Sequence, residues 1–238
     1  MLDFSGRVVL VTGAAGNLGR AVANGFMQAG AQTAVVDRSL GRLETLYAGA
    51  GVADEPLRLS GIDVTQPDSV SAMVSRTLER FGRLDVLVNT VGGFRANKPV
   101  AETPLEDWDV MFDLNVRTAF MTARVVVPHF LERRYGRIIN VGARPGYAGR
   151  AGMAAYSASK AALLRLTESL SEEVKGQGIT VNAVIPGTLD TPQNRAAMPD
   201  ADPSAWVRPE AVAFAIQFLA SAQAEAITGA ALPVYGRS

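Results

Sequence analysis

Tyr156 and Lys160 are the residues whose types and spacing point most directly to chemistry. They stand four positions apart in the run AAYSASKAALLRL, whose composition predicts a helix. Side chains at positions i and i+4 lie on one helical face, so the phenol and the ammonium can share a pocket. A nearby cation favours the phenolate, which brings the pKa of a tyrosine towards the range useful for proton exchange with a substrate. The alternative is an ordinary helix with one tyrosine and one exposed lysine.

A glycine-rich turn near the N-terminus is the second candidate. The strand-like run RVVLVT is followed by Gly13, Gly16 and Gly19, and then by a predicted helix that extends to about residue 29. In such a strand–turn–helix unit, backbone N–H groups and a helix N-terminus can face a pyrophosphate. Asp37 ends the next predicted strand, where a carboxylate can bind an adenosine ribose and would repel a 2′-phosphate. The pattern favours NAD(H), although the adjacent Arg38 leaves NADP(H) open, and a helix cap is the alternative role of the carboxylate.

Composition narrows the classes of function. The chain has 238 residues, 48% of them hydrophobic, and its 23 basic side chains balance 23 acidic ones. A net charge of zero gives no electrostatic reason to expect nucleic acid or an anionic membrane as partner. With no cysteine and one histidine, His129, neither a disulfide nor a Cys/His metal site is expected, and this histidine is predicted to be structural. The sequence shows no signal-peptide pattern and no long apolar run, and it predicts a cytoplasmic protein.

The elements that must position these residues alternate between strands and helices. Continuous β-branched runs, typical of buried parallel strands, lie at residues 7–12, 32–37, 57–62, 84–89, 136–141, 179–185 and 232–234. Further helices are predicted at residues 40–48, 66–81, 103–133, 154–175 and 209–220. Thr65 is expected to cap the second of these, and Thr103 with Glu106 forms a capping-box pattern at the third. The alternation predicts an α/β fold, a Rossmann-type doubly wound parallel sheet, in a single domain over residues 1–238.

Ligands of such a sheet bind at the carboxyl ends of its strands. The candidate residues follow those ends, at 13–19, Asp37, Asp63, Asn89, 141–143 and 186–191. Asn115 lies in the apolar run MFDLNVRTAF, where a buried amide needs partners, and it is either structural or part of the site. The polar segment 187–208 interrupts the alternation. Two short helical patches fit inside it, and its composition is typical of a mobile lid or substrate loop.

Together these motifs resemble the short-chain dehydrogenase/reductase superfamily over nearly the whole chain. The matching features are TG…G at 12–19, Asp37, Asp63-Val64, NxxG at 89–92, Asn115, YSASK at 156–160 and PG…T at 186–191. The resemblance implies that Tyr156 donates a proton, that Lys160 lowers its pKa and binds the nicotinamide ribose, and that Asn115 holds a relay water through backbone distortion. It also implies cofactor contacts from Gly13, Asn17, Leu18, Gly19, Asp37, Arg38, Asp63, Val64, Asn89, Val91, Gly92, Tyr156, Lys160, Pro186, Leu189 and Thr191.

Three departures from the superfamily pattern bear on function. Asn17 replaces the middle glycine of the turn, where asparagine's tolerance of left-handed backbone is expected to preserve phosphate binding. Thr90-Val91 replaces the usual asparagine–alanine pair. Ala143 stands thirteen residues before Tyr156, at the usual serine position, and losing such a donor typically costs about 10²–10³ in rate. Either activity is lost or the substrate does not need that contact.

A narrower resemblance favours the second explanation. Segments 91–94, 142–153 and 188–206 are similar to dihydropteridine reductase, which implies NADH and a quinonoid dihydropterin as substrate. Such a conjugated system disperses the charge of an arriving hydride within itself, so that no localised alkoxide needs a serine. Phe94, Tyr147 and Trp206 are aromatic residues that can stack on such a ring beside Ala143, although each fits ordinary packing equally well.

Three hypotheses about function follow. The first is an NADH-preferring oxidoreductase acting on a pterin-like or quinonoid substrate. The second is a generic carbonyl reductase or alcohol dehydrogenase, with small ketones or 3-oxoacyl compounds as substrates. The third is a catalytically silent dinucleotide-binding protein. The helices at 103–133 and 154–175 carry apolar side chains on more than one face, and the family resemblance implies that they pair into a homodimer or homotetramer.

Overall fold

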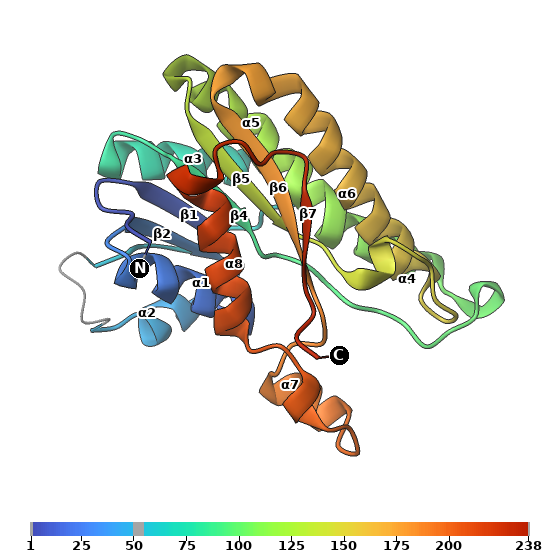
Figure 1. Cartoon of the computed structure of the whole chain (residues 1–238). Coiled ribbons are helices and arrows are strands. Elements are labelled where there is room, and N and C mark those ends of the chain that lie inside the picture. Colours follow the sequence, from blue (N-terminus) through green and yellow to red (C-terminus); the bar gives the residue numbers. More distant parts are fainter. Residues whose placement is uncertain (1, 50–54, 238) are drawn as a thin grey trace.

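A parallel sheet forms the centre of the computed structural model, which describes residues 2–49 and 55–237 (Figure 1). Within those residues the sheet has seven strands: β1 (Val8–Thr12), β2 (Gln32–Asp37), β3 (Leu57–Ser60), β4 (Val86–Asn89), β5 (Gly136–Val141), β6 (Ile179–Pro186) and β7 (Ala231–Val234). Their order is β3-β2-β1-β4-β5-β6-β7, and all neighbours run parallel. The strand order reverses between β1 and β4, which is where a doubly wound sheet opens a crevice for ligands. The predicted fold class is confirmed.

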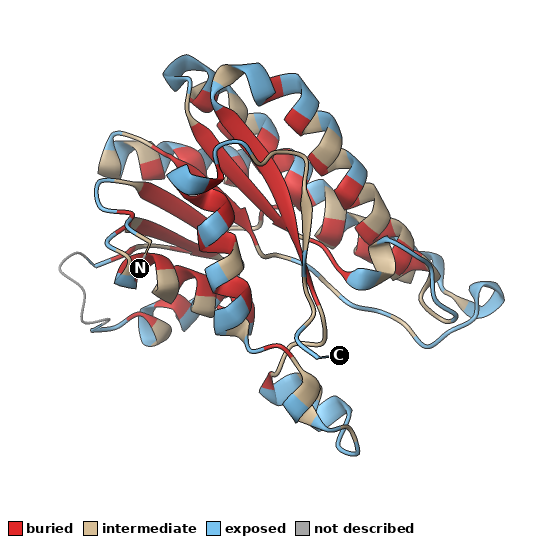
Figure 2. Cartoon of the chain, viewed as in Figure 1, coloured by how far each residue is buried: buried red, intermediate tan, exposed pale blue. Residues whose placement is uncertain are grey.

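Helices cover both faces of this sheet (Figure 2). The α-helices of the described residues are α1 (Asn17–Gln28), α2 (Arg42–Leu46), α3 (Pro67–Phe81), α4 (Leu105–Phe112), α5 (Thr118–Arg133), α6 (Ala154–Val174), α7 (Pro192–Ala197) and α8 (Pro209–Ala220). Helices α1 and α8 pack on one face, whereas α3 and α5 pack on the other. No helix in the described part of the chain is long and apolar enough to cross a membrane.

Alternation along the strands divides the core between these two layers. In β1, Val9 and Val11 join the cluster under α1 and α8, while Val8 and Leu10 join the cluster under α3 and α5. All four side chains are fully buried. Successive side chains of a strand point to opposite faces, so a run without polar residues is what a strand covered on both sides requires.

Two predicted helix caps are wrong. Helix α3 starts after Gln66 without a side-chain cap, because the hydroxyl of Thr65 instead donates to Asp63 Oδ1 at 2.7 Å. Helix α4 starts after Pro104, and the hydroxyl of Thr103 donates back to the Pro99 carbonyl at 3.0 Å. In both places the hydroxyl closes a turn that precedes the helix, and a hydroxyl used in that way is not available to the first helical N–H groups.

The long predicted helix at 103–133 is interrupted. A π-helical turn, Asp113–Arg117, separates α4 from α5 and carries Asn115 at its centre. The helix predicted at 40–48 is also shorter than expected, because α2 covers only Arg42–Leu46. Such π-turns commonly occur at functional sites, since they displace one side chain from the regular helical face.

Candidate active site

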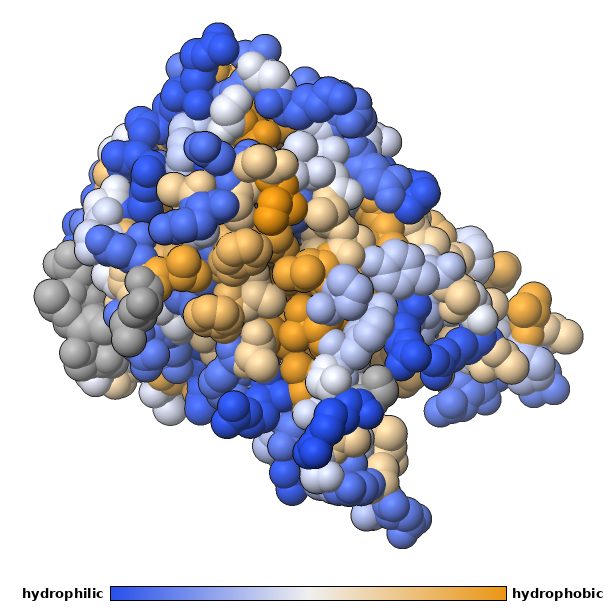
Figure 3. Space-filling model, in the orientation of Figure 1, coloured by the Kyte–Doolittle hydropathy of each residue, from blue (hydrophilic) through white to orange (hydrophobic). Residues whose placement is uncertain are grey.

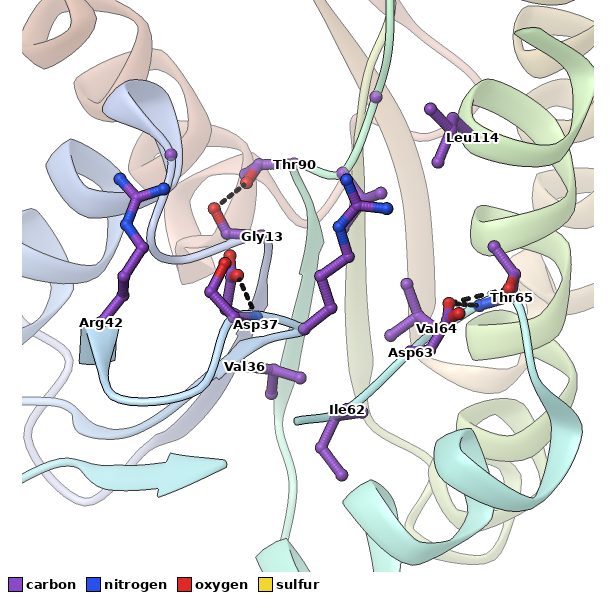
Figure 4. A pocket seen from close by; sticks show the side chains of 15 residues that line it. Gly13, Val36, Asp37, Arg42, Ile62, Asp63, Val64, Thr65, Thr90 and Leu114 are labelled. Carbon is purple, nitrogen blue, oxygen red and sulfur yellow. Dashed lines mark hydrogen bonds between the residues drawn. The ribbon is translucent and has the colours of Figure 1, made fainter. Parts of the chain in front are cut away.

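A cavity of about 290 Å³ opens at the carboxyl ends of β1, β2 and β4 (Figure 4). It is lined by Gly13, Gly16, Val36, Asp37, Arg38, Ser39, Arg42, Ile62, Asp63, Val64, Thr65, Thr90, Val91, Gly92 and Leu114. Seven predicted cofactor residues are therefore in its wall: Gly13, Asp37, Arg38, Asp63, Val64, Val91 and Gly92. The other predicted cofactor residues lie outside this lining, and six of them are buried: Leu18, Gly19, Asn89, Lys160, Pro186 and Thr191.

The glycine-rich turn packs too closely for side chains. A Cβ atom on Gly19 would lie 2.2 Å from the carbonyl oxygen of Gly13, and Gly13 itself has a left-handed φ of +67°. The hydroxyl of Thr90 donates to the Thr12 carbonyl at 2.6 Å and ties the turn to the end of β4. Asn17 does not take the left-handed conformation expected of it, because it is the first residue of α1. Its side chain is thus exposed at the helix N-terminus, where a phosphate would bind.

The carboxylate of Asp37 connects this turn to the loop after β2. Its Oδ2 accepts a hydrogen bond from the Ala15 N–H at 3.1 Å, and its Oδ1 accepts one from the Ser39 N–H at 2.9 Å. Asp37 therefore does not cap α2, which follows Gly41 without a side-chain cap. Each carboxylate oxygen can accept more than one hydrogen bond, so Asp37, which lines the cavity, keeps acceptor capacity for a ligand.

Two guanidinium groups border the cavity next to Asp37. Arg38 is exposed, and Arg42 donates from Nη2 to the Ala15 carbonyl at 3.1 Å. The sequence-based prediction included Arg38 but missed Arg42. The only sequence signal for Arg42 was a basic residue five positions after the acidic one, and that spacing has no meaning until the loop between them is known.

Asn89 turns its side chain into the core. Its Nδ2 donates to Asn140 Oδ1 at 2.9 Å, and its Oδ1 accepts from the Thr122 hydroxyl at 3.0 Å. Asn140 in turn donates to the Thr167 hydroxyl at 2.9 Å. This buried network joins β4, β5, α5 and α6 below the cavity. The side chain of Asn89 therefore supports the site, and only its backbone is left for a ligand.

Asn115 is buried and fully partnered. Its Oδ1 accepts from the Gly93 N–H at 2.9 Å, and its Nδ2 donates to the Gly93 carbonyl at 3.1 Å and to the Ser159 hydroxyl at 3.0 Å. The hydroxyl of Ser159 donates to the Tyr156 carbonyl at 2.8 Å. The amide thus joins the segment after β4 to the first turns of α6, which carry the tyrosine. The π-helical turn supplies the backbone distortion expected at this residue.

Lys160 and Tyr156 share one buried region, as the helical spacing predicts. Lys160 is 5% exposed, and its ammonium donates to the Val141 carbonyl at 2.9 Å. Its Nζ lies 6.0 Å from the centre of the Tyr156 ring. Burial lowers the pKa of Lys160 to about 8 and raises the pKa of Tyr156 to about 12. The expected lowering of the tyrosine pKa is therefore not what the structure shows, because desolvation of the phenolate dominates and the ammonium binds a carbonyl instead.

The position of the usual serine holds a buried methyl group. Ala143 is 7% exposed with an extended backbone, and it is the second residue after the end of β5. The preceding Gly142 is tightly packed, since a Cβ atom there would lie 2.5 Å from Ile185 Cδ1.

The three aromatic residues predicted to contact the substrate, Phe94, Tyr147 and Trp206, have different surroundings. The ring of Phe94 meets the Tyr156 ring edge-on at 4.9 Å and remains 59% exposed. The hydroxyl of Tyr147 instead donates to the Ala231 carbonyl of β7 at 2.9 Å, which engages this residue with the edge of the sheet. Trp206 is half-buried at the end of the 3₁₀ turn Pro203–Ala205. Phe94 is the candidate that the structure brings to the tyrosine.

Segment 187–208 contains the two short helical patches that were predicted, α7 and the 3₁₀ turn. Its base is closed by a bridge between Leu189 and Val207. The hydroxyl of Thr191 caps α7 by accepting from the Asn194 N–H at 3.2 Å, so this side chain has a structural use. Gln193 is a residue that the sequence-based prediction missed, and its Oε1 accepts a hydrogen bond from Asn17 Nδ2 at 2.6 Å.

With this fold and site, the chain belongs to the short chain dehydrogenase family, whose model matches residues 7–202. It is an NAD(P)-dependent oxidoreductase. The chain is 34% identical to the 3-oxoacyl-(acyl-carrier-protein) reductase FabG of Thermotoga maritima, over 99% of this chain and 98% of that protein. The FabG of Escherichia coli is 33% identical over the same shares. The 2-(R)-hydroxypropyl-CoM dehydrogenase of Xanthobacter autotrophicus is 36% identical, over 97% of each chain. None of these three is named a dihydropteridine reductase.

Proposed function

We propose that this protein prefers NAD(H) and reduces a planar, conjugated substrate of the pterin-like or quinonoid class. The observation that carries this proposal is the buried methyl group of Ala143 at the position of the expected hydroxyl. A carbonyl that becomes a localised alkoxide needs a hydrogen-bond donor there, whereas a conjugated acceptor spreads the charge over its own ring system. The exposed ring of Phe94 beside Tyr156 supports it further, because it offers an apolar edge to a flat substrate.

The residues at the strand ends fit a dinucleotide. The close packing of Gly13 and Gly19 lets backbone approach a pyrophosphate, and the adjoining cavity extends to Asp37. When bound, the nicotinamide supplies the hydride. The protein's part is to orient the two reactants and to deliver a proton.

In this proposal Tyr156 is the proton donor. A phenol with a pKa of about 12 is protonated at neutral pH, as a general acid must be. The ammonium of Lys160 has N–H groups beyond the one bound to Val141, and these would hold the nicotinamide ribose. Asn115 positions the first turns of α6 and, in this proposal, the relay water.

The preference for NAD(H) depends on Asp37. Its carboxylate would repel a 2′-phosphate, while Arg38 and Arg42 border the same cavity and would attract one. Replacement of Asp37 by serine should therefore shift the ratio of kcat/KM for NADPH over NADH upwards by at least about 10-fold. A ratio that stays unchanged would show that this carboxylate does not select the cofactor.

A second candidate function comes from the relatives. The names of the relatives described above refer to a 3-oxoacyl group and to a 2-(R)-hydroxypropyl group, a ketone and a secondary alcohol. By this analogy the chain interconverts a ketone and a secondary alcohol, and another group replaces the missing hydroxyl. The substitution Ala143→Ser separates the two candidates, because it restores the donor that a ketone needs.

The deciding experiment follows NADH and NADPH oxidation with two acceptor classes, for the wild type and Ala143→Ser. Quinonoid dihydropterin and simple quinones represent the first class; small ketones and 3-oxoacyl thioesters represent the second. Our proposal expects wild-type turnover of the first class and no gain there from the added hydroxyl. Wild-type turnover confined to the second class, rising about 10-fold or more in Ala143→Ser, would overturn it in favour of the ketone.

We also propose that the protein self-associates into a dimer or tetramer. Support comes from large apolar side chains exposed on the helices around 103–133, namely Leu105, Trp108 and Phe120. A further apolar area lies over α8 and β7, where Phe214 is 60% exposed (Figure 3). Sedimentation of the wild type against Phe120→Ser and Phe214→Ser tests both faces; a monomeric wild type at micromolar concentration would refute the proposal.

A further inference from the structure

Helix α7 is weakly attached to the rest of the molecule. None of its residues is buried, and it projects away from the layers around the sheet (Figure 1). Two of its polar contacts stay inside its own segment: Asn194 donates to the Leu189 carbonyl at 2.8 Å, and Arg195 pairs with Asp190 at 2.6 Å. These bonds give the helix its shape without fixing its place over the protein.

One bond does reach across to the body of the protein. Asn17 Nδ2 donates to Gln193 Oε1 at 2.6 Å, although the two residues are 176 positions apart in the chain. Asn17 opens α1 within the glycine-rich turn, directly after Gly16, and Gln193 lies in the first turn of α7, on the segment that follows β6. The bond therefore joins the segment that follows β1 to the segment that follows β6, and both segments contain residues of the proposed dinucleotide site.

We propose that Asn17 and Gln193 form a latch that holds α7 over the bound dinucleotide and slows its release. A glycine at position 17 has no side chain with which to make this bond, so the asparagine adds a contact rather than merely being tolerated. Both partners are exposed and neutral, and a bond of this kind breaks readily in water. Such a bond suits a part that must open in every catalytic cycle, since lid opening limits product release in many enzymes. This inference rests on the proposed dinucleotide site.

The test compares Asn17→Gly, Gln193→Ala and the double variant, with Ala196→Ser as a matched control. Ala196 is exposed on the same short helix. The first readout is the NADH dissociation rate, measured by stopped-flow fluorescence. Each single variant should release NADH about 2- to 10-fold faster, from the typical net strength of such a bond. The double variant should be no faster than the single ones, because both changes break the same bond, and the control should match the wild type.

The second readout needs no cofactor. Amide hydrogen exchange of residues 193–197 in the cofactor-free protein should rise in both single variants and stay unchanged in the control. Gln193→Ala leaves the glycine-rich turn intact, so its effect cannot be attributed to lost phosphate contacts. Unchanged exchange and unchanged dissociation in Gln193→Ala would overturn the latch. So would effects that multiply in the double variant. A wild type that binds no NADH would instead refute the proposed function, while the exchange readout would still judge the latch.

Discussion

The two ends of the parallel strands differ in the partners that they provide for a buried charge. At the edge where the strands begin, Asp85 has a fully buried side chain that accepts the Val8 N–H at 2.9 Å. The same carboxylate forms ion pairs with Arg7 at 3.5 Å, with Arg83 through two nitrogens, and with Arg133 at 3.8 Å. At the edge where the strands end, the buried ammonium of Lys160 binds only the Val141 carbonyl in the contacts of the described residues.

The pKa shifts of the two cations show what this difference does. The hydrogen bond to Asp85 raises the pKa of Arg83, which fixes the arginine in its charged form. Burial lowers the pKa of Lys160 to about 8, close to neutral pH. An arginine that is paired with a buried carboxylate stays charged and does not exchange a proton near neutral pH. A buried ammonium without a carboxylate partner lowers the stability of the fold, and its pKa shifts towards neutral pH. The end of the sheet where the strands begin therefore holds a structural ion-pair cluster, and the end where the strands finish holds the groups that can exchange protons.

The largest expected effect belongs to the edge where the strands end. Tyr156→Phe should lower kcat/KM by about 10²–10⁴, because it removes the proton donor and little else. Steady-state kinetics measure the loss, and urea unfolding should show a midpoint close to that of the wild type. If the variant keeps wild-type turnover, the role assigned to the tyrosine is wrong.

The opposite pattern is expected at the edge where the strands begin. Asp85→Ala should lower the free energy of unfolding by about 3 kcal/mol, since it leaves the arginines without their counter-charge and the Val8 N–H without its acceptor. Turnover per folded molecule should stay near that of the wild type at low temperature. Asp85→Asn is the matched control: it keeps an acceptor and should lose less stability. If Asp85→Ala keeps its stability but loses turnover, the structural role assigned to the Asp85 cluster is wrong.

The buried lysine should make stability depend on pH. The folded-state pKa of Lys160 is about 8 and the ordinary value is 10.5, so between these the unfolded chain binds more protons. Stability of the wild type therefore gains as pH rises through this window. Lys160→Met removes the buried cation and should be more stable than the wild type at pH ~7, by about 1–2 kcal/mol, although inactive.

Urea unfolding of both proteins at several pH values between ~7 and ~9.5 checks this expectation. The difference between the variant and the wild type should shrink as pH rises. A constant difference would mean that the lysine does not titrate in this range.

The smallest effect is expected at His129, next to the Asp85 cluster. Its Nε2 accepts a hydrogen bond from the Leu84 N–H at 3.2 Å. The pKa of His129 lies below 6.5, mainly because the imidazole is partly buried. His129→Ala should cost about 1 kcal/mol at pH ~7.5. Protonation of His129 favours the unfolded state. The stability advantage of the wild type over His129→Ala should therefore disappear as pH falls below 6.5. Thermal unfolding at pH ~7.5 and ~5.5 measures the change, and an advantage that persists in acid would refute it.

Much of the fold was predictable because it depends on patterns of local sequence. Buried strands such as β2 and β5 begin and end where the apolar runs do, and Asp37 and the glycine-rich turn follow the strand ends as expected. The predictions failed where one side chain chooses among several partners. Thr103 and Thr65 have the residue type of a helix cap but close earlier turns, and Tyr147 turns to β7 rather than to the tyrosine.

Sequence alone placed Asp37 and the glycine-rich turn at the carboxyl end of the sheet, because strand periodicity and parallel topology bring all strand ends together. It also showed that Ala143 lacks the expected hydroxyl, since that depends only on residue type and spacing. The tertiary structure decided what each side chain does there. Burial set the pKa values of Lys160 and Tyr156, and the pairing of Asn17 with Gln193 joined segments 176 positions apart. Solvent exclusion and long-range contacts arise only when the chain has packed, so local sequence does not contain them.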